Sequence, residues 1–478
     1  MRNLTLMTDL YQLTMMYGYW KHNMQKNKAV FDLYYRRQGD VTSHAIAAGL
    51  EQAIEYIQNL SFDEEDLQYL RSLKLFDEPF LQELSHLRFT GDLHAVPEGT
   101  VVFPDEPIVR IFAPIMEAQF IETALLNIIN HQTLIATKAA RVCQAAHGGS
   151  VLEFGLRRAQ GPDAGIYGAR AAIIGGCSAT SNVLTGQLFG IPVKGTHAHS
   201  WVMSFGSELE AFRAYAETFP NSCLLLVDTY DTLRSGVPNA ITVFQELKAK
   251  GHEPVGIRLD SGDLTYLSRT ARKMLDDAGF EKAKIFASGD LDEDVIWNLK
   301  AQGAQIDVWG VGTRLITSQD NPALGGVYKL AAEEIDGVLH PRIKISENPQ
   351  KITSPGLKVL YRVYDGETKK AVADLIALEE EIYDTSMPLR LFDPVNTWKT
   401  MTVTNYILRP LLVPVFSSGK LVYESPTLLQ IQAYAAREMD SFWGEYKRLQ
   451  SPHRYKVDLS QPLYDMKQRL LSASSKAE

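Results

Sequence analysis

Between residues 150 and 310 the chain alternates short apolar runs with stretches in which apolar positions recur at helical spacing. Each apolar run closes in small or polar residues. Continuous apolar runs that alternate with helices are typical of a buried parallel sheet. The predicted strands are residues 150–154, 171–175, 191–195, 223–227, 254–259, 283–287 and 305–310, and the predicted helices include residues 204–219, 239–250, 264–278 and 292–302.

About seven such units within roughly 160 residues favour an irregular (β/α) barrel over the alternative, an open doubly wound sheet. In a barrel the carboxyl ends of the strands meet at one mouth, where the active sites of barrel enzymes lie. The pattern therefore predicts an α/β catalytic domain over residues 146–340, with its functional residues at the strand ends.

Two other regions flank this domain. An N-terminal α+β domain is predicted over residues 1–145, and a C-terminal extension over residues 341–478 should pack on it. The N-terminal signals are a helix capped by Asp9 with Gln12 at capping-box spacing, a strand over 29–35, two helices up to about residue 86, strands within 91–112 and an apolar helix over 116–146. The C-terminal signals are a strand pair around Asp365-Gly366, an amphipathic helix over about 428–449 and a polar tail from Ser472.

Composition narrows the class of protein. Apolar residues make up 45% and charged residues 22%, with a net charge of −9 and a pI near 5.7. Because the basic residues are scattered, we expect no nucleic-acid partner, although a local basic pocket can still bind a small anion. The N-terminus has no signal-peptide core, no apolar run reaches membrane length, and only three cysteines occur, far apart (Cys143, Cys177 and Cys223). We therefore expect a soluble cytoplasmic protein without a membrane partner.

The residues that close the predicted strands form the candidate site. Backbone amides at Gly289 and at Gly310-x-Gly312 suit a phosphate group. Phe154 beside Arg157 suits a flat ring that carries an anion, through stacking and a salt bridge. Carboxylates suit a ribose diol or a magnesium ion held through water and phosphate oxygens. These carboxylates are Asp228, Asp231, Asp260, Asp263 and Asp290.

Other basic and aromatic residues leave two interpretations open. Arg36-Arg37 follows a predicted strand, and Lys138 and Arg141 lie on one face of a helix. Either pair can bind phosphate or remain solvated at the surface. Tyr11 can lie at the edge of the core or contact a ligand. No Walker loop or complete dinucleotide-binding fingerprint is present, so phosphates must be bound in another way.

Two histidines, His197 and His199, lie in the central stretch Lys194-Gly195-Thr196-His197-Ala198-His199-Ser200-Trp201. Histidine can act as a nucleophile or as a metal ligand. A His-x-His pair at a barrel strand end also occurs in zinc amidohydrolases, which need two further histidines on later strands. Only His252, His340 and His453 follow, none at a predicted strand end. A non-catalytic binding barrel is also disfavoured, because clustered carboxylates are costly without a ligand.

Taken together, these residues resemble the nicotinate phosphoribosyltransferase family over most of the chain. The resemblance rests on many ordered matches. They are Thr8-Asp9-Leu10-Tyr11-Gln12, Glu153-Phe154-Gly155-Leu156-Arg157-Arg158-Ala159-Gln160-Gly161, Gly195-Thr196-x-Ala198-His199-Ser200, Asp228-Thr229-Tyr230-Asp231, Gly256-x-Arg258-Leu259-Asp260-Ser261-Gly262-Asp263-Leu264, Gly310-x-Gly312-Thr313, Gly325-Gly326-Val327-Tyr328-Lys329-Leu330, and Leu360-Tyr361-Arg362 with Asp374-Leu375-Ile376.

The resemblance implies an ATP-dependent enzyme of the ligase class that joins nicotinate to 5-phosphoribosyl 1-diphosphate. The products are nicotinate mononucleotide and diphosphate, and the reaction is the first step of NAD synthesis from nicotinate. ATP is implied as a co-substrate that phosphorylates His199, not His197, and Mg²⁺ as the cofactor. Family members are homodimers, which implies that the region around Asp9 and Tyr11 reaches the barrel of a second copy.

The resemblance also assigns roles to single residues. Nicotinate would contact Tyr11, Thr196 and Arg258, with Phe154 and Arg157 as the stacking platform. Asp260 and Asp290 would face the ribose or Mg²⁺, directly or through water. Thr313 and the neighbouring glycines Gly310 and Gly312 would hold the 5-phosphate of the phosphoribosyl group, and Arg36 would reach the diphosphate from the second copy. Gly289, Lys138 and Arg141 are candidates for phosphate binding from the residue pattern alone.

The nearest alternative is the nicotinamide-using relative, which keeps an aspartate to accept the amide proton. The stretch that aligns with it, Gly176-Cys177-Ser178-Ala179-Thr180, has no acid. A carboxylate substrate would be repelled by such an acid and attracted by Arg258, so nicotinate is favoured.

Overall fold

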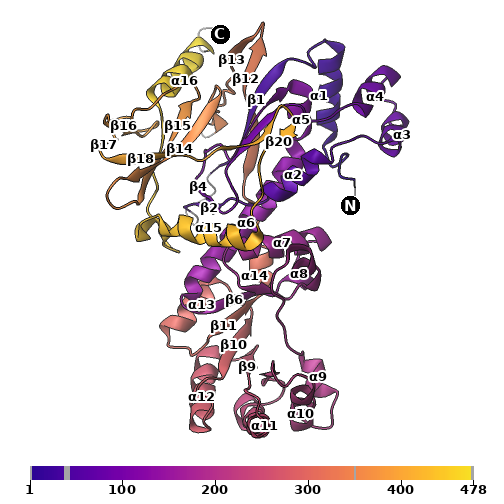
Figure 1. Cartoon of the computed structure of the whole chain (residues 1–478), viewed down its shortest axis with the longest axis vertical. Coiled ribbons are helices and arrows are strands. Elements are labelled where there is room, and N and C mark those ends of the chain that lie inside the picture. Colours follow the sequence, from indigo (N-terminus) through magenta and orange to yellow (C-terminus); the bar gives the residue numbers. More distant parts are fainter. Residues whose placement is uncertain (1–2, 37–42, 349–350, 475–478) are drawn as a thin grey trace. The chain divides into compact units, whose positions relative to one another are not determined.

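The computed structural model describes residues 3–36, 43–348 and 351–474. By internal contacts the chain forms two compact units. Figure 1 colours the chain by residue number, so the residues of each unit can be located from its colour bar. Unit 1 contains the residues up to Leu134 and those from Ala323 onward, and unit 2 is Ile135–Pro322. The predicted regions 1–145 and 341–478 thus lie largely in unit 1, and the predicted region 146–340 lies largely in unit 2.

Unit 1 contains an antiparallel sheet of seven strands, in the order β13-β12-β1-β5-β3-β19-β20. Its interior strand β1 (Lys28–Tyr35) is buried at every position except the first. The other strands are β3 (Asp92–Ala95), β5 (Val109–Pro114), β12 (Gly326–Ile335), β13 (Val338–Pro341), β19 (Val413–Ser417) and β20 (Lys420–Leu421). C-terminal strands therefore pair with N-terminal ones, so the C-terminal region packs on the N-terminal region as expected.

The helices of unit 1 differ from the prediction in number and length. Among the described residues between β1 and residue 86 there are three helices, not two, because Asp63 and Asp77 each cap a new helix start. The expected helix over 116–146 is interrupted at Ile121 and forms two helices, and the one expected over 428–449 ends at Asp440. The helices are α1 (Leu10–Lys21), α2 (Leu50–Gln58), α3 (Glu64–Ser72), α4 (Glu78–Ser85), α5 (Ile115–Phe120), α6 (Glu122–Ala146), α15 (Leu428–Asp440) and α16 (Gln461–Ser474), and the boundary between the units falls within α6.

A buried ion cluster joins the C-terminal elements to the N-terminal region of unit 1. The predicted hairpin at Asp365-Gly366 is present as β14 (Lys358–Asp365) and β15 (Ala371–Leu378), in a four-stranded sheet with β18 (Tyr406–Pro410) and β21 (Val457–Leu459). Arg362 on β14 has no exposed side-chain surface and forms ion pairs with Asp374 at 2.6 Å and with Glu438 at 2.9 Å. It also donates to the backbone oxygen of Val101 at 2.7 Å. A cation in such a site is tolerated only because every nearby acceptor compensates its charge.

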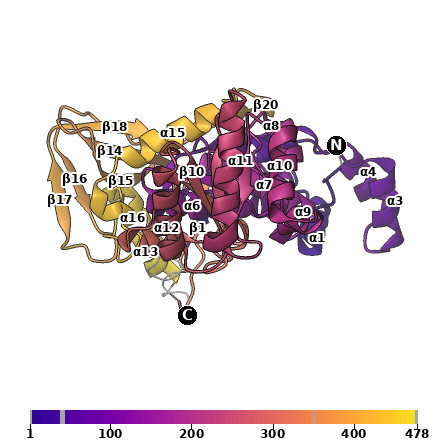
Figure 2. The same cartoon turned by 90° about the horizontal axis from the view of Figure 1, so that it is seen from below.

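Unit 2 contains a parallel sheet of six strands, in the order β7-β6-β11-β10-β9-β8. The strands are β6 (Ser150–Glu153), β7 (Ala179–Thr180), β8 (Leu224–Leu226), β9 (Gly256–Leu259), β10 (Lys284–Gly289) and β11 (Val308–Val311). The helices are α7 (Pro162–Ile174), α8 (Val183–Phe189), α9 (His199–Met203), α10 (Glu208–Thr218), α11 (Val237–Ala249), α12 (Leu264–Asp277), α13 (Glu293–Ala301) and α14 (Thr313–Ile316). Helices α11 and α12 pack side by side, with α12 against β9 and β10 (Figure 2).

The alternation of strand and helix predicted the parallel sheet, but two of its seven expected strands are wrong. Residues 171–175 form the end of α7, and the strand is the later β7. Alanine and isoleucine residues there are buried without interruption, and a helix buried all round has the same continuous apolar run as a strand. Residues 191–195 make only an isolated bridge, between Val193 and Thr180. Strand pairing within residues 135–322 leaves the sheet open between β7 and β8.

Residues 192–197, called here the bridging segment, lie between these two open edges. On the β7 side the contacts are made by the main chain: Thr180 N donates to Pro192 O at 3.1 Å, and Lys194 N donates to Thr180 O at 3.0 Å. On the β8 side they are made by side chains, those of Thr196 and His197, described below. The bridging segment, which overlaps the histidine-containing stretch 194–201, is therefore hydrogen-bonded to both edges of the sheet.

Across the three described ranges, no helix has both the length and the apolar character needed to cross a membrane.

Candidate active site

His199 is the first residue of α9 and lies between two carboxylates. Its Nε2 is 4.0 Å from Oδ1 of Asp228 and 3.9 Å from Oδ2 of Asp260. Its Nδ1 is 3.1 Å from the hydroxyl oxygen of Thr229. The side chain is 39% exposed, so the ring can be reached from solvent while its orientation is fixed. This environment orients the ring and places a carboxylate oxygen on either side of Nε2.

Asp228 follows β8 and has only 2% of its side chain exposed. Its Oδ2 accepts from the amide of Asp260 at 2.9 Å and from the hydroxyl of Ser261 at 2.7 Å. Its Oδ1 is buried, and no described residue donates a hydrogen bond to it. A buried oxygen without a donor costs on the order of 1–3 kcal/mol, and His199 Nε2 lies 4.0 Å from it, beyond hydrogen-bond distance.

Arg258, Asp260 and Ser288 form a hydrogen-bonded triangle at the ends of β9 and β10. Arg258 donates from Nε to the Ser288 hydroxyl at 2.7 Å and from Nη2 to Asp260 Oδ1 at 2.8 Å, and Ser288 also donates to Asp260. Burial alone would raise the pKa of Asp260. The hydrogen bond from Ser288 and the charge of Arg258 outweigh burial and hold that pKa below its usual value.

Phe154 lies beside this triangle, because the Arg258 guanidinium is 5.8 Å from the centre of its ring. Two glycines of β11 and the following turn make room for Phe154. A Cβ at Gly310 would come within 2.7 Å of the ring, and one at Gly312 would lie 3.1 Å from the Phe154 carbonyl oxygen. These glycines were predicted from phosphate binding, and the structure gives them a steric reason as well. Arg157 is exposed on the 3-10 turn after Phe154.

The other strand-end residues also belong to unit 2. Gly289 has φ +118°, and a Cβ there would lie 2.7 Å from the carbonyl oxygen of Asp260, so only glycine fits. Asp290 is exposed directly after it. Thr313 begins α14 and is half-buried. Gly289 and Asp290 therefore close β10, the strand that also carries Ser288.

Lys138 and Arg141 on α6 are engaged with carboxylates. Lys138 Nζ lies 2.7 Å from Glu293 Oε2 and also pairs with Asp320, and Arg141 Nε donates to Glu293 Oε1 at 2.8 Å. Glu293, the first residue of α13, is buried. The two cations thus hold α6 to α13, and a phosphate would have to compete with Glu293 for them.

Tyr11 and Arg36 belong to unit 1, and each unit is described by itself. Tyr11 on α1 is 46% exposed, and partial burial, together with the charge of Glu122, raises its pKa. At the start of this helix Gln12 Oε1 accepts from the amide of Asp9 at 3.2 Å, as the capping-box spacing predicts. Arg36 follows β1, and its amide donates to Gly325 O at 3.2 Å. Arg37, its predicted partner, lies outside the described residues.

His197 has a different environment from His199. It is 8% exposed, and burial lowers its pKa to about 4, with the charges of Arg258 and His199 adding to the effect. Nε2 accepts from the amide of Leu226 at 3.3 Å, which leaves Nδ1 as the protonated nitrogen, 3.4 Å from Ala198 O. With Nε2 occupied in this way, His197 is unsuited to pair with His199 around a zinc ion.

Sequence reasoning missed three hydroxyls of the site: Thr229, Ser261 and Ser288. Ser288 lies next to the predicted Gly289, and Arg258 and Asp260 are two apart, hence on one face of β9. Strand register brings Ser288 to that face, and a single sequence does not contain register. Hydroxyls near strand ends are too common to be selected without it.

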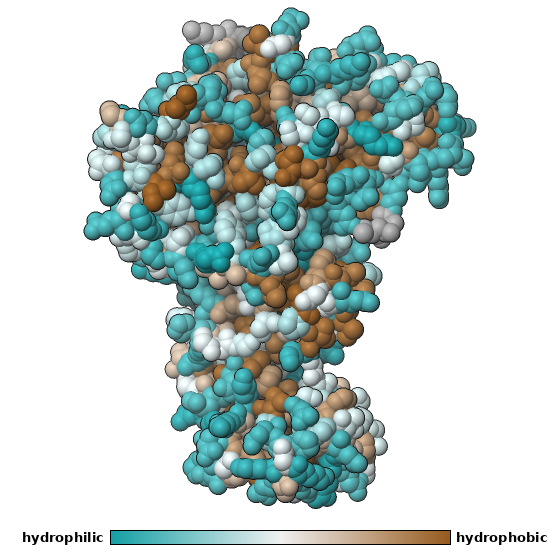
Figure 3. Space-filling view, viewed as in Figure 1, coloured by the Kyte–Doolittle hydropathy of each residue, from teal (hydrophilic) through white to brown (hydrophobic). Residues whose placement is uncertain are grey.

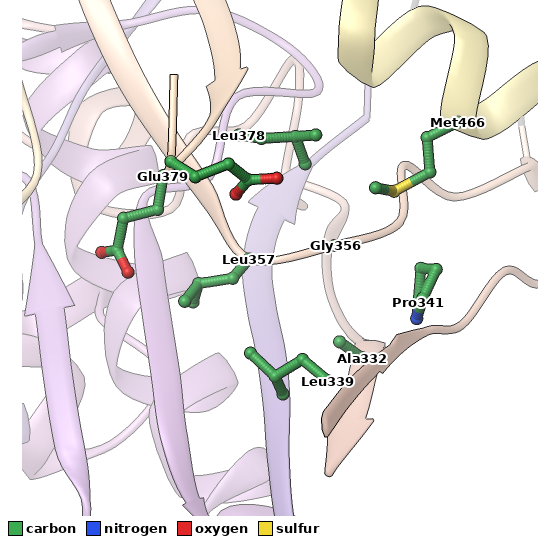
Figure 4. A pocket seen from close by; sticks show the side chains of 9 residues that line it. Ala332, Leu339, Pro341, Gly356, Leu357, Leu378, Glu379 and Met466 are labelled. Atoms are coloured by element: carbon green, nitrogen blue, oxygen red, sulfur yellow. The ribbon is translucent and has the colours of Figure 1, made fainter. Parts of the chain in front are cut away.

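A cavity of about 260 Å³ in unit 1 does not suit a phosphate (Figure 4). Its lining is apolar apart from Glu379 and Glu380, and Glu379 is paired with Arg110 at 2.8 Å. Carboxylates at a pocket mouth repel anions. The strand ends of unit 2 are therefore the better candidate for a site that binds small anionic substrates.

An α/β enzyme that acts on small anionic molecules at the carboxyl edge of a parallel sheet is the class that this fold and site define. Comparison with known proteins gives the family. Family models described as the nicotinate phosphoribosyltransferase N-terminal domain, family and C-terminal domain match residues 6–130, 150–372 and 357–467. The chain belongs to the nicotinate phosphoribosyltransferase family.

Individual relatives are similar in sequence to this chain over almost its full length. Nicotinate phosphoribosyltransferase of Bacillus subtilis (strain 168) is 51% identical over 477 residues, covering 100% of this chain and 97% of the relative. The human protein of the same name is 34% identical, covering 98% of this chain and 97% of the relative. The crystal structure of human nicotinic acid phosphoribosyltransferase superposes with a TM-score of 0.86 at 32% identity, over 97% of this chain and 99% of that one.

Proposed function

We propose that this protein transfers the phosphoribosyl group of 5-phosphoribosyl 1-diphosphate to nicotinate, which yields nicotinate mononucleotide and diphosphate and brings nicotinate into NAD synthesis. The names of its relatives support the reaction. The observation that carries the proposal is the cluster at the ends of β8, β9 and β10, where Asp260 lies 3.9 Å from His199 and 2.8 Å from Arg258.

Nicotinate recognition is assigned to Phe154 and Arg258, with Arg157 and Thr196 contributing, and with Tyr11 supplied by a second copy of the chain. A pyridine ring can stack on Phe154 while its carboxylate meets the guanidinium beside that ring. Nicotinamide has no charge to pair with Arg258, which supports a preference for nicotinate. The hydroxyl proton of Thr196 is already donated to Leu224 O, so Thr196 would offer a ligand its oxygen lone pairs.

The transfer breaks the bond between ribose C1 and the diphosphate oxygen and forms one to the pyridine nitrogen. Positive charge develops on the ribose, where the ionised Asp260 stabilises it. Asp260 Oδ1 accepts from Arg258 and Ser288, so Oδ2 is available to a ribose hydroxyl or a metal-bound water. Gly289, Gly310, Gly312 and Thr313 are proposed to hold the 5-phosphate, and Arg36 of a second copy of the chain is proposed to hold the diphosphate.

Mg²⁺ is proposed as the cofactor, near Asp260 and Asp290. Magnesium keeps most of its waters and uses one or two carboxylates together with substrate phosphates, and this donor set fits that habit. When bound, the ion would neutralise the leaving diphosphate.

Coupling to ATP through a phosphohistidine at His199 would place the enzyme in the ligase class. Nδ1 of His199 faces the Thr229 hydroxyl, so Nε2, which lies between Asp228 and Asp260, would be the nucleophile. Its lone pair would form the bond to the γ-phosphorus of ATP as the bond to the ADP oxygen breaks. Asp228 and Asp260 would stabilise the charge on the ring, and hydrolysis would later release phosphate.

Two further features are proposed for the assembly. The bridging segment would close the six-stranded sheet into an irregular barrel, through main chain on one edge and side chains on the other. A homodimer is supported by exposed apolar residues on two helices, Leu10, Tyr11 and Met15 on α1 and Val183, Leu184 and Leu188 on α8. Apolar surface gathers in the region of α8 in Figure 3. Patches of this kind commonly mark contacts with another protein.

The test is a direct assay. The protein is incubated with nicotinate, 5-phosphoribosyl 1-diphosphate, Mg²⁺ and ATP, and with nicotinamide in place of nicotinate as the control. Nicotinate mononucleotide formed with stoichiometric ADP supports the proposal. A preference for nicotinamide, or the absence of product, overturns the reaction. Product formation that is independent of ATP overturns only the coupling.

A further inference from the structure

At the free edge of β8, two backbone groups have no partner strand and face the bridging segment. In a parallel pair, alternate residues of a strand bond to one neighbour, and the residues between them point to the other side. Val227 N donates to Arg258 O at 3.1 Å, and Val255 N donates to Cys223 O at 2.9 Å, so the odd-numbered residues of β8 face β9. Leu224 and Leu226 therefore face away from β9, toward the edge at which no seventh strand follows.

Two adjacent side chains take the place of that strand. Thr196 Oγ1 donates to Leu224 O at 2.6 Å, and His197 Nε2 accepts from Leu226 N at 3.3 Å. The donor and acceptor roles are those a paired strand would supply, one residue acting as donor and the next as acceptor. The main chain of the same segment pairs with Thr180 on β7. The histidine side chain thus completes the β8 edge of the sheet.

His197 can fill this role only as a neutral ring with its proton on Nδ1. A protonated Nε2 would place two donors against each other at Leu226. The surroundings favour the neutral form, because the ring is buried and Tyr215 lies edge-on against it at 4.7 Å between ring centres. Nδ1 points to the carbonyl oxygen of Ala198. Ala198 precedes His199 and caps α9.

We infer that His197 is a positioning residue: as a fixed, neutral acceptor for Leu226, it holds the bridging segment to β8 and so places His199 against Asp228 and Asp260. Asp228 follows β8 by two residues, and His199 follows His197 by two. The hydrogen bond between His197 and Leu226 therefore joins the two short segments that carry His199 and Asp228. Loss of this bond would let the histidine and the carboxylate move relative to each other.

The inference rests on the proposed function in one respect, the role of His199 as phosphate acceptor. His197→Leu removes the acceptor at similar volume, and His197→Gln restores an acceptor oxygen near the place of Nε2. His252→Leu is the matched control, because His252 lies in the same unit and bonds through its ring to Asn221 rather than to a strand edge. The measurements are kcat, KM for nicotinate, and the rate of phosphate transfer from γ-labelled ATP to His199.

The expected result for His197→Leu is a fall in kcat and in the phosphorylation rate on the order of 10- to 100-fold, with a smaller change in KM. His197→Gln should recover most of the loss, and His252→Leu should behave as wild type. A folded His197→Leu protein with wild-type rates overturns the inference, since the ring would then only fill space. Failure of the wild-type protein to phosphorylate His199 counts against the proposed function instead.

A measurement on the wild-type protein keeps the inference testable if His197→Leu does not fold. Histidine labelled with ¹⁵N reports the tautomer of each ring, and His197→Gln identifies the resonance of residue 197. A ring protonated on Nδ1 only, with a slowly exchanging Leu226 amide, supports the inference. A ring protonated on Nε2, or a fast-exchanging Leu226 amide, overturns it.

Discussion

Oδ1 of Asp228 faces Nε2 of His199 at 4.0 Å, while its other oxygen is fixed by two donors from the β9 end. The carboxylate is thus anchored on one side and unsatisfied on the side of the histidine. This geometry gives Asp228 a role in stabilising charge on His199 that its place in the sequence alone did not reveal.

Replacing Asp228 with asparagine should reduce phosphate transfer to His199 on the order of 100-fold, because the amide keeps the shape but not the charge that stabilises the ring. The protein should remain folded. Incorporation of labelled phosphate from ATP measures the effect. Asp277→Asn, which alters an exposed aspartate on α12, is the control. Equal rates for the two variants would contradict the role of Asp228.

Ser288→Ala should shift the pH dependence of the reaction. The hydrogen bond from Ser288 helps to hold the pKa of Asp260 below its usual value, so its removal raises that pKa. Catalysis needs the ionised carboxylate, and activity is lost as the pH falls through the pKa of Asp260. The acidic limb of kcat/KM against pH should therefore move to higher pH in Ser288→Ala and stay in place in Ser235→Ala. An unmoved limb would show that another group controls it.

His197 should make unfolding pH-dependent. In the folded protein its pKa is about 4, whereas an unfolded histidine titrates near the usual value of about 6.5. Between these two values the unfolded state binds more protons, so the free energy of unfolding falls as the pH falls through this window. The contribution is at most about 3 kcal/mol.

Urea unfolding at about pH 7 and about pH 5 measures this contribution. His197→Gln has no ring to protonate, so its free energy of unfolding should decline less between the two conditions. His252→Gln should decline as wild type does. A decline as steep in His197→Gln as in wild type would exclude His197 as the source.

Gly310→Ala should weaken nicotinate binding. The added Cβ would come within 2.7 Å of the Phe154 ring, which must then shift away from Arg258. Overpacking of this kind costs roughly 1–3 kcal/mol, equivalent to about a 5- to 150-fold rise in KM for nicotinate. Gly444→Ala, with open space around the new Cβ, is the control. Steady-state kinetics with nicotinate varied provide the measurement, and an unchanged KM would show that Phe154 is not part of the platform.

Strand-by-strand periodicity predicted the parallel sheet of unit 2 because five of its six strands are continuous buried runs between helices. It could not distinguish the buried end of α7 from a strand, since burial on all sides removes the period of 3.6 residues. It also could not foresee that residues 192–197 bond through side chains at one edge. The first error arises from burial and the second from pairing, and both depend on residues elsewhere in the sequence.

The candidate site was predictable to the extent that strand ends of a parallel sheet share one edge. Asp260 and Arg258 were found in that way, and strand register brings Ser288 to them. The ion pairs of Lys138 and Arg141 were not predictable, because Glu293 and Asp320 lie more than 150 residues away in the chain. A basic face on a helix does not reveal which carboxylates will meet it.

Unit 1 is built from residues at both ends of the chain, and this affects the order in which the chain can fold during synthesis. Strand β1 pairs early with β5, but its other neighbour, β12, begins at Gly326. All of unit 2 leaves the ribosome before that strand does, and the ion partner Glu438 of Arg362 follows later still. The N-terminal residues must therefore wait with an open sheet edge while the inserted unit is completed, which reverses the usual order in which the first part of a chain folds first.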